Sequence, residues 1–158
     1  MAIVAGSKIN AADLVLPASV AGDGNGANTI TATSWTDLPT NGATATITNP
    51  HPTLSMLVQV GYGCCMSSLT NGVRSSVRAS GGVTVASGPG AIFQNWGEIP
   101  WLAGTASTLY MQFFALGYLT IPAGVGAVTL TAQAYRDVAA GTQQVNYPTI
   151  RLTPQRYV

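Results

Sequence analysis

The chain carries very little charge. Only 7% of its 158 residues are Asp, Glu, Lys or Arg, against about a quarter in an average soluble domain. Its apolar residues come in short alternating runs separated by Gly, Pro and Asn-Gly. None of these runs approaches the roughly 18 residues needed to span a membrane. A chain that avoids charge without entering lipid covers much of its surface with protein, so the sequence predicts a β-rich subunit of a larger assembly.

The balance of charge argues against several classes of partner. Six basic residues face five acidic ones, for a net charge of +1. The basic residues form no patch that could neutralise a phosphate backbone, so we expect no nucleic-acid partner. The apolar stretch Met1–Ala5 is too short for a secretory signal. We therefore expect synthesis in a cytosol and no membrane insertion.

The first 28 residues differ in composition from the rest. A modestly apolar segment is followed by a Gly/Asn/Asp stretch over 21–28, whose composition is typical of a flexible spacer. We assign residues 1–28 to an N-terminal docking arm and spacer, and 29–158 to one domain. A first strand of the same domain is the other interpretation of this segment. In the arm interpretation, four side chains make the docking contacts: Ile3, Val4, Ile9 and Leu14.

From residue 29 onward, polar and apolar residues alternate with the period of half-buried β-strands. Asn-Gly pairs at 41–42 and 71–72 separate such runs and predict β-hairpins. Turn residues recur at near-regular spacing and no helical periodicity is present. The pattern predicts an all-β fold, an antiparallel two-sheet β-sandwich of about eight strands and of jelly-roll type.

The run over 107–121 is apolar or aromatic on both faces of a strand. This pattern predicts a central strand that is buried on both sides. One face can pack in the core, and the other needs cover that a neighbouring copy would supply. Burial of both faces in a thick core of the same domain is the alternative. Four aromatic residues are predicted at the interface between copies: Tyr110, Phe114, Tyr118 and Tyr135.

The loop over 88–105 contains three aromatic residues, Phe93, Trp96 and Trp101. Aromatic side chains in such a loop either plug the end of a sandwich or form a ligand-binding rim, and both interpretations remain open. The adjacent Cys64 and Cys65 point to opposite faces of a strand, and we interpret them as two small hydrophobic residues.

The sequence lacks the residue sets that catalysis requires. Its single histidine, His51, lies between two prolines and is predicted to be a surface turn residue. The five acidic residues are scattered, and most lie in turns, so no acid–base pair is apparent. No cysteine or histidine spacing predicts a metal site. We expect no enzymatic activity, no cofactor and no bound metal.

Three stretches resemble virion proteins of tailed bacteriophages. The opening Met1–Leu14, with its Ile-x-Ala-x-Asp-Leu motif, is similar to the starts of many small phage virion proteins. The stretch Leu119–Gly124, followed by Val128–Gln133, resembles the penultimate hairpin of C1q/TNF-like jelly rolls in phage tail and decoration proteins. The segment Ser34–Pro39 is similar to the early strand of that fold. Together these stretches cover less than half of the chain.

The resemblance implies a homotrimer with aromatic residues of the central strands near its axis. It also implies attachment to capsid or tail proteins, which would place the chain in the virion as a non-enzymatic capsid decoration or minor tail protein. The chain lacks the shaft of a long fibre, which favours a compact knob fixed by its arm. The alternative function is a tail-tip domain whose aromatic rim recognises a host surface glycan or protein.

Overall fold

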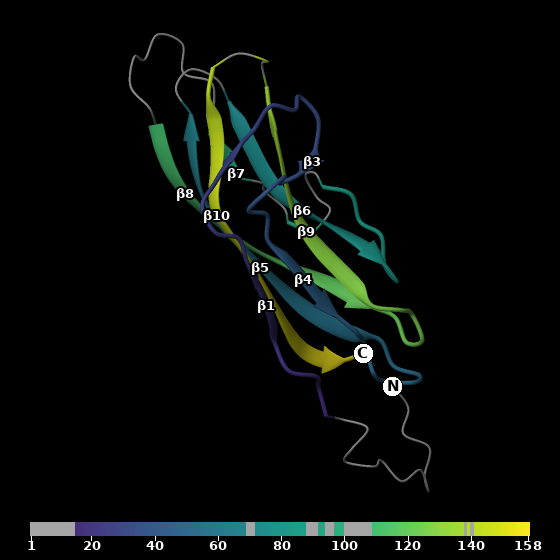
Figure 1. Ribbon diagram of the computed structural model, residues 1–158. Coiled ribbons are helices and arrows are strands. Elements are labelled where there is room, and N and C mark those ends of the chain that lie inside the picture. Colours follow the sequence, from purple (N-terminus) through teal and green to yellow (C-terminus); the bar gives the residue numbers. More distant parts are fainter. Residues whose placement is uncertain are drawn as a thin grey trace, which may run out of the picture.

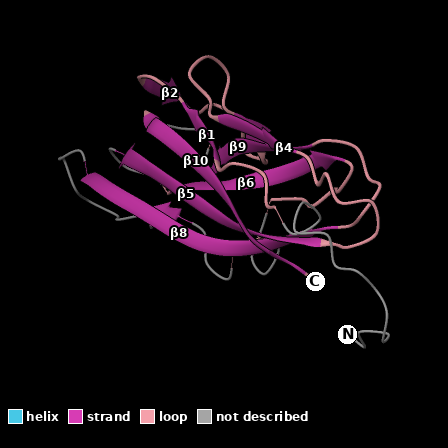
Figure 2. Cartoon of the chain, turned by 90° about the horizontal axis from the view of Figure 1, so that it is seen from below, coloured by secondary structure: helices cyan, strands magenta, loops and turns pink. Residues whose placement is uncertain are grey.

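The described part of the chain folds into two β-sheets packed face to face. A computed structural model gives the structure, which describes residues 15–68, 72–87, 92–93, 97–99, 109–137, 139 and 141–158. Sheet A contains β1 (Val20–Asp23), β2 (Ala27–Thr29), β5 (Met56–Ser68), β8 (Leu109–Ile121) and β10 (Gln143–Tyr157). Sheet B contains β3 (Thr36–Asp37), β4 (Thr44–Ile47), β6 (Val73–Gly81), β7 (Gly97–Ile99) and β9 (Val128–Arg136). Figures 1 and 2 show the two layers.

All strand pairs in both sheets are antiparallel. The strand order is β1-β10-β5-β8 in sheet A, with β2 also on β10, and β3-β9-β6-β7 in sheet B, with β4 also on β9. From β4 onward the chain crosses from one sheet to the other at every connection except that from β6 to β7, which pair directly. This wrapping is that of a jelly roll, so the predicted all-β sandwich is confirmed.

The two predicted hairpins are wrong. The pair Asn41-Gly42 separates β3 from β4, and both of these strands pair with β9 rather than with each other. Residues 71–72 separate β5 of sheet A from β6 of sheet B. One pair thus separates two strands that lie on the same neighbour, and the other separates strands of different sheets. An Asn-Gly pair therefore identifies a reversal of the chain without fixing which strands pair.

The core lies between the sheets and is built from the alternate residues of each long strand. On β5 these are Met56, Val58, Val60 and Tyr62, which are completely buried. The Tyr62 hydroxyl lies 2.5 Å from Ser75 Oγ, which in turn donates to the Gln133 carbonyl at 3.1 Å. Because both polar groups are bonded, burying the tyrosine leaves no unpaired hydroxyl in the core.

Part of the predicted spacer belongs to the sandwich. β1 and β2 fall within residues 20–29, and both pair with β10, for example Val20 with Leu152. The prediction of a flexible spacer over 21–28 is therefore wrong for these strands. The Gly and Asn residues of this stretch serve a tight turn between them. The predicted docking residues of the arm lie outside the described residues.

His51 occupies a turn, as expected, but it is buried rather than on the surface. Its Nδ1 accepts hydrogen bonds from the backbone N–H groups of Thr53 and Leu54, at 3.2 and 2.9 Å. Its ring packs against Tyr157, with the centroids 4.7 Å apart. The histidine therefore closes the turn between β4 and β5 and packs it against the end of β10.

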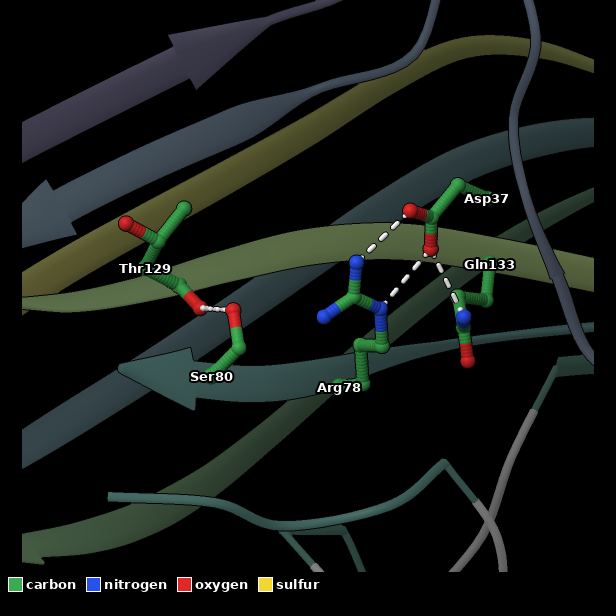
Figure 3. Close-up of polar contacts among 5 residues, drawn as sticks. All are labelled: Asp37, Arg78, Ser80, Thr129 and Gln133. Atoms are coloured by element: carbon green, nitrogen blue, oxygen red, sulfur yellow. Dashed lines mark hydrogen bonds and ion pairs between the residues drawn. The ribbon is translucent and has the colours of Figure 1, made fainter. Parts of the chain in front are cut away.

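A polar cluster on the outer face of sheet B holds the two-residue strand β3 in place (Figure 3). Asp37 accepts from Arg78 Nε at 2.8 Å and from Arg78 Nη2 at 2.7 Å. It also accepts from Gln133 Nε2 at 2.7 Å. The hydrogen bonds from Arg78 lower the pKa of the Asp37 carboxyl below its ordinary value, against the opposing effect of burial. The cluster thus links β3 across β9 to β6.

The Asp37 cluster makes stability depend on pH. A carboxyl whose pKa is lowered by folding stabilises the fold above its unfolded pKa of about 3.9, and the stabilisation is lost as pH falls through the folded value. Because both partners are partly exposed, we expect Asp37→Asn to lower the free energy of unfolding by only about 0.5–1 kcal/mol at pH 7. Urea unfolding at pH 7 and at pH 2.5 measures this difference. An equal difference at both pH values would contradict the prediction.

Candidate functional site

β8 is an edge strand, which corrects the prediction of a central strand. It pairs with β5 over all of its 13 residues. Within the described chain no strand pairs with its other side, and Figure 2 shows it as the outermost strand of its layer. The strand contains no charged residue and no proline. Long uncharged edges of this kind readily accept another chain, and proteins usually protect them.

The outer face of β8 exposes three large apolar side chains, which we call the β8 patch. Phe114 is 67% exposed, Leu116 55% and Tyr118 57%. Leu119 and Ile121, which follow on the opposite face of the strand, are buried in the core. The structure therefore differs from the alternative in which both faces are buried within one domain. At the end of the strand one row of side chains is packed, and no described residue covers the other row; Met111, near the start of the strand, is 41% exposed.

Two glycines of β5 form the surface on which the β8 patch lies. A Cβ atom at Gly61 would be 3.6 Å from Leu116 Cδ2, and one at Gly63 would be 3.5 Å from Phe114 Cδ2. The side chains of β8 thus lie over backbone that carries no side chain of its own. The result is a low apolar surface extending from the open edge across to the neighbouring strand.

A shallow hollow of about 370 Å³ adjoins Phe114 on this face. Its outward-facing lining is uncharged and comprises Gly63, Cys65, Gln112, Phe114, Tyr147 and Thr149. Tyr147 is 63% exposed. We call this hollow the Phe114–Tyr147 hollow.

The far side of sheet A differs in chemistry from the β8 side. There Arg151 of β10 forms an ion pair with Asp23 of β1, at 2.6 Å. Both side chains are about half exposed. The outer face therefore runs from an apolar border at β8 to a charged border at β1, and it is not symmetric.

The two cysteines lie on opposite faces of β5, as the strand period predicts. Cys64 is buried in the core, and desolvation raises its pKa to about 11. Cys65 is partly exposed and lines the Phe114–Tyr147 hollow. Neither forms a disulfide in the structure.

Thiol labelling should therefore distinguish the two cysteines. The thiolate is the reactive form, and burial keeps Cys64 protonated and inaccessible. In the dissociated single chain we expect a maleimide at pH 7.5 to add once, at Cys65, and Cys65→Ser to abolish the reaction. Mass spectrometry of tryptic peptides measures the adduct. An adduct on Cys64 under native conditions would show that the core at β5 is open.

The remaining predicted site residues fall in different places. Tyr110 belongs to β8, but its side chain is not among those described. Tyr135 lies on β9 of sheet B and not beside Phe114 and Tyr118, and its place at an interface between copies stays a prediction. Its ring packs edge-on against Trp35, with the centroids 4.7 Å apart, and its hydroxyl accepts a hydrogen bond from Arg74. Tyr135 thus packs the segment before β3 onto sheet B.

Phe93 is buried, with 2% of its surface exposed. Its ring lies 6.3 Å from that of Tyr62, and a Cβ at Gly117 would be 2.9 Å from its Cδ1. Phe93 is therefore a plug on the inner face of β8, and its inclusion in an exposed rim is wrong. Trp96 and Trp101 lie outside the described residues.

Sequence reasoning missed two residues of this surface. Leu116 alternates with Phe114 and Tyr118 along β8, so the strand period could have included it. Tyr147 gave no such indication, because its place depends on a backbone conformation that the sequence does not reveal.

Among the described residues, no three His, Cys, Asp or Glu side chains are grouped as a metal site. The described residues also form no helix long and apolar enough to cross a membrane.

Comparisons with known proteins give a likeness in fold alone. No family profile matches the chain, and no curated protein matches its sequence. Among solved structures, the chain is similar to Eiger TNF from S. frugiperda, with a TM-score of 0.49 and 10% identity. The match covers 87% of this chain and 92% of that one. Because a likeness at this level does not establish kinship, the jelly-roll assignment rests on the strand connectivity.

Proposed function

We propose that the chain is a structural subunit that assembles with two further copies of itself through the β8 patch. The observation that carries this proposal is an uncharged edge strand of 13 residues with three large apolar side chains more than half exposed. A second copy suits this surface because its own β8 patch carries no charge. A strongly charged partner would lose hydration there without gaining an ion pair.

The energetics favour association. Burying an exposed Phe, Leu or Tyr contributes about 1.5–3 kcal/mol per side chain, before the costs of ordering and lost motion. An open strand edge beside the patch adds backbone groups that a neighbour can hydrogen bond. A closed ring of three copies contains the same contact three times. A modest favourable free energy at each interface is therefore added three times.

A ring would bring two different borders of sheet A together. In a two-fold contact one surface meets itself, whereas in a ring one surface meets a different one. The apolar border at β8 and the Asp23–Arg151 border at β1 are different surfaces of one sheet. A ring lets the open edge of one copy pack across the outer face of the next. The number three comes from the resemblance to C1q/TNF-like jelly rolls given by the sequence.

The assembly would be a compact knob on a bacteriophage particle, a decoration or minor tail protein. The resemblance of residues 1–14 to the starts of phage virion proteins supports this placement. The chain before Val15 is then the docking arm for a capsid or tail protein. Val15 and Leu16 already belong to the folded domain, because the Tyr157 hydroxyl donates to the Val15 carbonyl and Leu16 packs on the core.

Leu116→Glu tests the assembly. The exposed position tolerates a charge in the single chain, but in the assembly that charge would be buried without a partner. We expect the wild-type protein to have three times the 16.2 kDa chain mass and the variant to have the mass of one chain. Light scattering measures both, and circular dichroism confirms that the variant is folded.

Thr44→Glu is the matched control. It adds the same charge at an exposed strand position on the opposite sheet, and we expect it to leave the mass unchanged. A wild-type protein with the mass of a single chain would overturn the proposal. So would a Leu116→Glu protein that keeps the wild-type mass.

Deleting residues 1–14 tests the docking arm separately. Because the deletion ends before Val15, the sandwich keeps its described contacts, and the truncated protein should still associate as three copies with the wild-type melting temperature. We expect it to be absent from particles assembled in its presence, as measured by sedimentation and immunoblotting. Normal incorporation would refute the arm's role and leave self-association standing.

A further inference from the structure

Tyr147 has a backbone conformation that tyrosine seldom adopts. Its φ is +49°, and among the described residues it is the one non-glycine with a positive φ. The left-handed region is costly for any residue with a bulky side chain. Such strain persists where surrounding contacts impose it, and it often marks a residue with a task beyond folding.

Backbone contacts hold the strained residue in place. The ladder between β10 and β5 slips between Asn146 and Thr149, so that Tyr147 lies in a β-bulge. The Tyr147 N–H donates to the Gly26 carbonyl at 3.1 Å, and the Gly24 N–H donates to the Pro148 carbonyl at 2.8 Å. The turn between β1 and β2 therefore clamps the bulge from both sides of Tyr147.

The clamp requires a very close approach of the two backbones. A Cβ atom at Gly24 would be 2.7 Å from Pro148 Cγ and 1.9 Å from the Asn41 carbonyl oxygen. The glycine is thus needed where the turn meets the bulge. The fold maintains this conformation by contacts outside the tyrosine side chain.

The ring held in this way contributes little to the core. It is 63% exposed and forms one wall of the Phe114–Tyr147 hollow, with Phe114 also in the lining and Gly63 beneath. Its backbone strain is therefore not offset by burial within the single chain. A surface aromatic displayed at a cost in stability is typical of a contact made with another molecule.

We infer that the Phe114–Tyr147 hollow is a socket for an apolar side chain of a neighbouring copy of this chain, with Tyr147 as its positioning wall. This inference rests on the proposed self-association and names the residue that gives it specificity. Two observations select a second copy as the occupant. The outward-facing lining carries no charge, and Phe114 belongs both to the socket and to the β8 patch, so the two surfaces are continuous.

The test is Tyr147→Gly, made in the wild-type chain and in the Leu116→Glu background. Glycine removes the ring and adopts the positive φ without strain. In the wild-type chain we expect the dissociation constant to rise at least about tenfold, measured by sedimentation equilibrium. In the Leu116→Glu chain, which reports the single subunit, we expect the melting temperature to stay the same or to rise by a few degrees.

Thr84→Gly is the control, because Thr84 is exposed, lies outside sheet A and has an ordinary φ. It should lower the melting temperature slightly and leave association unchanged, the reverse of the pattern for Tyr147→Gly. Unchanged association of Tyr147→Gly overturns the socket and leaves the proposed function intact. A melting temperature several degrees lower in the Leu116→Glu background also overturns it, since the ring would then serve its own fold. If Leu116→Glu itself keeps the wild-type mass, both proposals fall.

Discussion

The structure depends on the core between the two sheets, which is formed by one row of apolar side chains from each long strand. On the edge strand β8, side chains of the opposite row are exposed. β5 lies inside sheet A and can bury its inward residues completely, because β10 and β8 flank it on either side. Among the described strands β8 has a neighbour on one side only; its inward-facing Leu119 and Ile121 are buried, while Phe114 and Tyr118 face outward. The same strand therefore contributes to the core and presents three exposed apolar side chains.

In the proposed assembly, folding and association depend on different residues. The free energy of folding is therefore set by other side chains than the free energy of association. The core is formed by fully buried residues such as Val60, Leu130 and Ile150, none of which belongs to the β8 patch. The buried Tyr62 hydroxyl is bonded within the same chain. A subunit built in this way can fold before it meets its neighbours. In the proposed assembly, association would then depend on a few side chains near the open edge, as is common where a small part of an interface dominates the affinity.

Much of the fold could be predicted from the period of the sequence. Alternation fixes which residues of β5 and β9 face the core, and the same alternation placed Cys64 and Cys65 on opposite faces. It could not identify strand partners, because neighbouring strands in a jelly roll are distant in sequence, as β10 and β5 are. For the same reason the Asn-Gly pairs suggested hairpins that do not form, and an apolar strand suggested a central position for β8.

The candidate site was predicted in part. Phe114 and Tyr118 followed from the strand period, whereas Tyr135 fell on the other sheet because period alone does not say which sheet a strand joins. The burial of Phe93 and His51 depends on tertiary contacts with Tyr62 and Tyr157 that local sequence does not encode. Tyr147 depends on a bulge and on a clamp by a distant turn, and both are properties of the folded backbone.

The hydrogen bond from Tyr157 to Val15 has a consequence for attachment. It fixes the first described residues beside the end of β10, close to the C-terminus marked in Figure 1. In a ring with three-fold symmetry, the three copies of Val15 would then leave the assembly toward one side. Three weak tethers pointing the same way bind with avidity, because each bound tether raises the effective concentration of the others. A knob could thus be held firmly on a surface although no single tether binds tightly.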